Sequence, residues 1–209
     1  MKCLYIDLAS NKGLLALVAG ESVIAAEHID QRLGDHELMP RVEALLRVSG
    51  SGFTDLTQVA CVVGPGGFMS LRVAVALANT LADQLQIPIA GVHLSDVYAA
   101  RMGNEENCLW LHSTKKTELF VRGFGDYEKQ WPVAIHVMLE DFVRDIGALH
   151  AKSLFWMGEL IPEHRLAMAP FVAEDRDLPL QRVEDVFPQF LQRQEFKKQI
   201  LEPWYGRGW

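Results

Sequence analysis

The amino-acid sequence predicts an α/β fold, because β-rich apolar runs alternate with segments whose apolar residues recur at helical spacing. Three strand-like runs open the chain. Residues 59–63 then form another β-rich run, which breaks at the glycine loop 64–67 and continues as an apolar helix. The order of strand, strand, strand, helix, strand, helix is that of the actin-like (ASKHA) and ribonuclease H-like α/β fold.

The first elements are predicted from short-range patterns. Residues 2–9, 14–19 and 23–29 are expected to form an antiparallel trio, with a hairpin turn at the Gly-Glu-Ser of residues 20–22. A first helix follows, and Gly50-Ser51-Gly52 ends it. Its apolar residues at helical spacing are Leu38, Met39, Val42, Leu45 and Leu46.

A second helix is expected over residues 71–85, ended by Pro88. Residues 89–93 then predict a strand, Ser95-Asp96 the start of a short helix, and residues 108–112 and 118–124 two more strands. Beyond about residue 125 the pattern weakens into short apolar pieces separated by prolines. The polar, turn-prone residues 103–107 predict a boundary, so we expect an N-terminal domain over residues 1–103 and a smaller second domain over residues 104–209.

Composition narrows the function classes. The 209 residues are 49% hydrophobic and carry a net charge of −7, so a role on RNA would need a local basic patch or a partner. Cys3, Cys61 and Cys108 lie far apart, which favours buried thiols in a reducing compartment. The N-terminus reaches Asp7 too soon for a signal peptide, and no run approaches the ~18 apolar residues of a membrane span. A cytoplasmic protein is expected.

The glycine loop first suggests a nucleotide site, because backbone N–H groups at a helix N-terminus bind phosphate readily. However, no Lys-Ser or Lys-Thr pair follows the glycines, and the second half of the chain lacks a matching phosphate loop. Asp7 could position a metal at the end of the first strand. Leu8-Ala9 behind it are not the glycine or hydroxyl residues that let backbone approach phosphate, which favours a structural Asp7.

Other catalytic patterns are incomplete. Ser70 could join a hydrolase triad, but its surroundings are not Gly-x-Ser-x-Gly. No two histidines fall three or four residues apart, although histidines distant in sequence could still converge on a metal. The seven histidines stand at positions 28, 36, 93, 112, 136, 150 and 164.

The second helix has an apolar arc wider than the ~100° stripe needed to cover one sheet face. It is either buried between the sheet and a neighbouring helix, or its small residues Ala74 and Ala78 admit a helix of another subunit. The two interpretations are compatible.

Six blocks, in order, resemble the TsaB (YeaZ) family. Residues 5–10 resemble the family's A-I-D-T-S opening, residues 35–40 resemble its E-H-S-x-x-L-L-P helix start, and residues 64–72 resemble its G-P-G-S-F-T-G-L-R loop. Further along the chain, residues 87–92 resemble the family's I-P-V-x-G-V, residues 115–120 its R-R-x-E-V-Y and residues 188–192 its P-x-Y-L-R. The chain departs from the family at Leu8-Ala9 for Thr-Ser and Met69-Ser70 for Thr-Gly. Ser113 replaces a frequent Asp, and Gln192 replaces Arg.

The resemblance implies a non-catalytic relative of the enzyme TsaD, which transfers threonylcarbamoyl to the tRNA adenosine beside the anticodon. Such a subunit would activate a TsaD-like partner in a complex that also contains a TsaE-like ATPase. It would contact tRNA only through that complex, and it would form a homodimer when alone. It implies no catalytic, cofactor or metal residue. The alternatives are an ATP-binding actin-like phosphotransferase and, less favoured, a peptidase.

In this family the two helices pack against the matching helices of the partner as a four-helix arrangement. The partner interface expected here is Leu38, Met39, Val42, Leu46, Ala74, Ala78 and Leu81. The expected structural loop is Gly64, Pro65, Gly66, Gly67 and Arg72. A long charged side chain at Ala78 is expected to abolish partner binding and leave the monomer folded.

Overall fold

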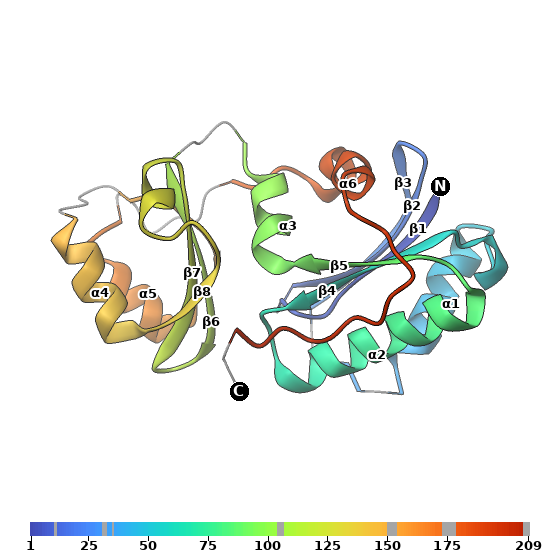
Figure 1. Cartoon of the computed structure of the whole chain (residues 1–209), viewed down its shortest axis with the longest axis horizontal. Helices are drawn as coiled ribbons and strands as arrows, with labels where there is room; N and C mark the ends of the chain where they lie inside the picture. Colours follow the sequence, from blue (N-terminus) through green and yellow to red (C-terminus); the bar gives the residue numbers. More distant parts are fainter. Residues whose placement is uncertain are drawn as a thin grey trace. The chain divides into compact units, whose positions relative to one another are not determined.

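A computed structural model describes residues 1–10, 12–30, 33–34, 36–103, 107–149, 154–172 and 179–206. Asp35, His150 and residues 104–106, which bear on the expectations above, lie outside the described residues. Within these ranges, no helix combines the length and the apolar character required to span a bilayer. The chain divides into two compact units, Met1–Ala100 with Arg182–Tyr205, and Arg101–Gln181 (Figure 1).

The first unit is built on a five-stranded sheet in the order β3-β2-β1-β4-β5. The strands are β1 Lys2–Asp7, β2 Gly13–Ala19, β3 Ser22–Ile29, β4 Gln58–Gly64 and β5 Ile89–His93. The first three pair antiparallel, whereas β4 runs parallel to both β1 and β5. Gly20 makes the first hairpin turn with a φ of 59°, which a residue without a Cβ adopts most readily.

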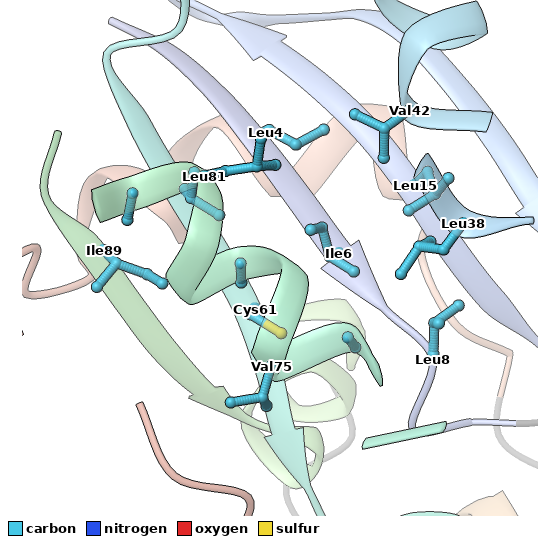
Figure 2. Packing of buried hydrophobic residues seen from close by; sticks show 14 of the residues in the cluster. Leu4, Ile6, Leu8, Leu15, Leu38, Val42, Cys61, Val75, Leu81 and Ile89 are labelled. Carbon is cyan, nitrogen blue, oxygen red and sulfur yellow. The ribbon is translucent and has the colours of Figure 1, made fainter. Parts of the chain in front are cut away.

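Helices α1 Leu38–Val48 and α2 Phe68–Leu85 cover one face of this sheet (Figure 1). Their apolar sides meet the sheet in one buried cluster, in which Leu38 and Val42 of α1 approach Ile6 and Leu15 (Figure 2). A short helix, η1 Phe53–Asp55, leads into β4, and α3 Leu94–Arg101 follows β5. The predicted α/β class and its opening order are therefore confirmed.

The opposite face of the sheet is covered by α6 Val183–Gln192. The ring of Phe187 meets that of Tyr5 edge-on, with centroids 4.8 Å apart. The chain thus returns to its first unit after residue 181, which differs from the division at residues 103 and 104 that we expected. The apolar side of α6 thus covers β2 and β3, together with Tyr5 of β1.

The second unit contains a four-stranded sheet in the order β8-β7-β6-β9. Its elements are β6 Cys108–Lys115, β7 Glu118–Phe124, η2 Gly125–Lys129, β8 Ile135–Met138, α4 Leu139–Ala148, β9 Trp156–Glu159 and α5 Pro162–Met168. Phe142 and Ile146 of α4 and Met168 of α5 pack with Leu109 and Leu111 of β6 in a buried core.

Candidate functional site: the glycine loop and two helices

The glycine loop lies beside the turn after β1, because β1 and β4 are parallel neighbours whose carboxyl ends meet. A Cβ built on Gly66 would lie 2.5 Å from the carbonyl oxygen of Ala9, far inside contact distance. Gly66 therefore lets the two turns pack backbone against backbone.

Asp7 is buried at the end of β1, and its carboxylate binds the following turn. Its Oδ1 accepts the N–H of Ala9 at 2.8 Å and that of Ser10 at 3.4 Å, while its Oδ2 accepts the Ser10 hydroxyl at 3.3 Å. A short carboxylate that bonds backbone two residues ahead is a common turn stabiliser. These contacts favour the structural interpretation of Asp7.

A segment near the C-terminus, around Trp204, contacts the glycine loop at its first residue, Gly64. The N–H of Trp204 donates to the carbonyl of Val63 at 2.7 Å. Gly64 has a φ of 145°, and a Cβ there would lie 2.1 Å from the Trp204 carbonyl oxygen. Gly64 and Gly66 are thus required by contacts with the chain's own backbone.

The remaining loop residues lead into α2. Gly64 and Pro65 are buried, Gly66 is half-buried and Gly67 is exposed. Arg72, also exposed, places its guanidinium 5.3 Å from the ring centroid of Phe68.

The residues expected at a partner interface lie inside the first unit. Leu38, Val42, Leu46, Ala74, Ala78 and Leu81 are all buried in the cluster beneath α1 and α2, and Met39 is half-buried against it. They form the side of each helix that faces the chain's own sheet. The expectation that a charge at Ala78 would leave the monomer folded is therefore wrong, because that side chain has no access to solvent.

The outward side of the same helices carries several small and apolar residues, beside the exposed charged residues Glu43 and Arg47 of α1. Val48 near the end of α1 is 84% exposed, and Ala44 one turn earlier is also exposed. On α2, Ala76 and Thr80 are exposed one turn apart, and Val73 is half-buried. We call these five small or apolar residues the outer helix face. Periodicity could not identify it, because small residues give almost no hydrophobic signal.

Sequence reasoning also missed a buried pair in the second unit. The Ser113 hydroxyl lies 2.7 Å from Nδ1 of His164, and Nε2 of His164 lies 2.9 Å from the Lys116 carbonyl. Because a carbonyl only accepts, Nε2 carries the proton and Nδ1 accepts from Ser113. The hydroxyl oxygen also accepts the Ile161 N–H at 3.2 Å. Since His164 has no exposed surface, the pair fastens the start of α5 to β6.

The other reactive side chains are buried or dispersed. The three cysteines are free and buried, and desolvation raises the pKa of Cys3 to about 12 and that of Cys61 further. Burial lowers the pKa of His112 to about 4. Within the described ranges, no group of three or more His, Cys, Asp or Glu side chains is placed to hold a metal ion.

The family model for TsaD, described as tRNA N6-adenosine threonylcarbamoyltransferase, matches residues 28–150, more than half of the chain. The Bacillus subtilis tRNA threonylcarbamoyladenosine biosynthesis protein TsaB is 28% identical over 89% of this chain and 76% of its own length. This chain belongs to the TsaB (YeaZ) family.

The Escherichia coli TsaB protein is 32% identical, over 44% of this chain and 40% of its own length. A solved structure described as an uncharacterised protein similar to peptidase YeaZ from Pseudomonas aeruginosa shares the fold. It superimposes with a TM-score of 0.68 at 19% identity over 99% of both chains. The likeness in fold therefore covers both units, on which the glycine loop and the Ser113–His164 pair lie.

Proposed function

We propose that this chain acts in forming threonylcarbamoyladenosine on tRNA, as a non-catalytic subunit that binds and activates a TsaD-like enzyme. The relatives named as threonylcarbamoyladenosine biosynthesis proteins, and the match to the TsaD family model, support the pathway. In the same proposal a TsaE-like ATPase joins the complex, and the chain pairs with itself when the enzyme is absent.

The outer helix face is the observation that carries the partner proposal. Both helices lie on one face of the sheet, and their sheet-facing sides share one core (Figure 1). Ala44, Ala76 and Thr80 leave little side-chain bulk on the outside, so a partner's helices can approach closely. Val48 and Val73 add the apolar area that such a contact would bury.

Two features support a role without catalysis. Asp7, where an actin-like ATPase would position its metal, is bonded to its own turn. The glycine loop packs against the backbone of Ala9 and Trp204, so contacts within the chain account for Gly66 and Gly64. With a net charge of −7, the chain is expected to reach tRNA only through its partner.

Charge placed on the outer helix face tests the proposal. Ala76→Arg should weaken binding to the TsaD-like protein of the same organism at least tenfold, measured by calorimetry, because it overpacks the contact and buries a charge. Ala148→Arg is the matched control, since Ala148 is an exposed alanine on α4 in the second unit. It should bind like the unchanged chain. Equal affinity of both variants, with circular dichroism showing both folded, would reject this surface.

A further inference from the structure

The last described residues of the chain run over the first unit as an extended strap. Residues 198–205 contain no helix or strand, yet they are fastened at several points along the edge of β5 and along α2. We name residues 197–205 the strap. In Figure 1 it is the red trace that passes in front of α2 toward the C-terminus.

The first fastening is at the open edge of the sheet. β5 is an edge strand, so its outward backbone groups have no partner strand. Ile89 and Lys197 exchange two backbone hydrogen bonds of 2.8 and 3.1 Å. The Gln199 side chain donates a further bond to the Ile89 carbonyl at 3.3 Å. The strap thus begins as a single antiparallel rung on β5.

The second fastening is the side chain of Asn79 on α2. Its Nδ2 donates to the Leu201 carbonyl, and its Oδ1 accepts the Leu201 N–H, both at 2.9 Å. The amide therefore replaces the peptide group of a neighbouring strand and satisfies both backbone groups of one residue. The two bonds together hold Leu201 opposite Asn79.

The Leu201 side chain fills a gap made by glycine. Leu201 is buried in the cluster beneath α2, and a Cβ on Gly91 would lie 3.1 Å from its Cδ2. Because Gly91 has no side chain, Leu201 reaches the core at the sheet edge. Its neighbours in the strap stay outside, with Ile200 83% exposed and Glu202 also exposed.

The third fastening lies at the glycine loop. Besides its bond to Val63, Trp204 sets its ring edge-on to that of His93, with centroids 4.6 Å apart. The next ring, Tyr205, stacks on Phe68 at the start of α2, 5.1 Å between centroids. These contacts place backbone and two aromatic rings over the loop and the first turn of α2.

From this arrangement we infer that residues 197–205 are a releasable strap that closes over the glycine loop, and that Asn79 is the residue that locks it in register. The strap is held at separate points, without a continuous ladder. These points are one edge rung, the side-chain amides of Asn79 and Gln199, the buried Leu201 side chain, the Trp204–Val63 backbone bond and two ring contacts. A segment fastened in this way opens locally while the rest of the fold stays intact. Opening uncovers Gly64, Phe68 and the edge of β5 together.

Trypsin tests the lock, because Lys197 and Lys198 lie where the strap begins. In the docked state the backbone of Lys197 is bonded to Ile89, so cleavage there requires release. Asn79→Ala should raise the rate of cleavage after residues 197 and 198 by about tenfold, since both bonds to Leu201 are lost. Mass spectrometry of the intact chain follows loss of residues 199–209.

Gln84→Ala is the matched control, because Gln84 carries an exposed side-chain amide on the same helix, and among the described residues that amide bonds Asp83 alone. It should be cleaved at the unchanged rate. Equal cleavage of the Asn79→Ala variant and the unchanged chain would overturn the assignment of Asn79 as the lock.

A chain that ends at residue 196 tests release itself. It should keep its far-UV circular dichroism and a cooperative unfolding transition, and a synthetic peptide of residues 196–206 should bind it and raise its melting temperature. The same peptide with Leu201→Ser should not. A shortened chain that is unfolded would contradict the proposal, because residues 197–205 would then be an integral part of the core. A folded shortened chain that fails to bind the peptide would contradict it equally.

Discussion

The carbonyl oxygen of Trp204 lies so close to Gly64 that a Cβ on that glycine would be 2.1 Å away. Two parts of the chain separated by most of its length thus meet backbone to backbone at the start of α2. Contacts within the chain explain Gly64 and Gly66, whereas a Cβ on Gly67 would meet no close neighbour.

Gly64→Ala should destabilise the first unit by about 3 kcal/mol, because the new methyl group meets the Trp204 backbone and the φ of 145° strains any L side chain. Urea denaturation of the isolated chain measures the change. In contrast, Gly67→Ala should change stability by less than about 1 kcal/mol, since its Cβ would meet only Ser70 atoms at 3.5 Å or more. Equal effects at the two positions would mean that the Trp204 contact does not determine the need for glycine.

Ala78→Glu should destabilise the isolated chain by about 3–5 kcal/mol, because it places an unpaired carboxylate in the cluster beneath α2. Ala76→Glu, two residues away on the exposed side, should change stability by less than about 0.5 kcal/mol. Chemical denaturation of both variants without any partner checks this. A stable Ala78→Glu monomer would show that α2 does not turn this side toward the sheet.

Ser113→Ala should cost about 1–3 kcal/mol, because Nδ1 of His164 and the N–H of Ile161 both lose their partner in a buried site. Ser70→Ala serves as the comparison, since the half-buried Ser70 hydroxyl makes no side-chain hydrogen bond among the described residues. It should be nearly neutral. Thermal unfolding followed by calorimetry distinguishes the two.

Stability should fall as the pH is lowered from about 6.5 toward 4 because of His112. Burial beside Trp110 lowers the pKa of the folded-state imidazole to about 4, so in this window the unfolded state binds more protons than the folded state. The contribution is at most about 3 kcal/mol. His112→Gln removes this titration, so its stability should depend less steeply on pH over the same range. Parallel pH profiles for the two proteins would contradict the shift.

Local patterns predicted the first unit well up to β5. The hairpin at Gly20, the end of α1 near Gly50 and the strand before the glycine loop all depend on near neighbours in sequence. In contrast, α6 was missed because Pro188 was interpreted as a break, whereas the helix contains it. The strap shows no hydrophobic periodicity in its sequence. It is held by Asn79 and by ring contacts, and no rule of residue spacing predicts such contacts.

The residues expected at the partner interface lie in the chain's own core for a related reason. Hydrophobic periodicity identifies the side of a helix that is buried, and for Ala74 and Ala78 that side faces the chain's own sheet. Ala76 and Thr80, which face outward, give no hydrophobic signal in the sequence. Ser113 and His164 are 51 residues apart in the sequence and match no motif, so only the folded structure reveals that they pair.

The central claim is that this chain activates a TsaD-like enzyme and performs no chemistry itself. Reconstitution of tRNA modification from purified components, with threonylcarbamoyl incorporation measured as the output, tests it most directly. The account predicts no incorporation by this chain alone and strong stimulation when it is added to its TsaD-like and TsaE-like partners, with Ala76→Arg failing to stimulate. Incorporation or Mg-ATP turnover by the isolated chain, or full activity of the partners without it, would contradict the account.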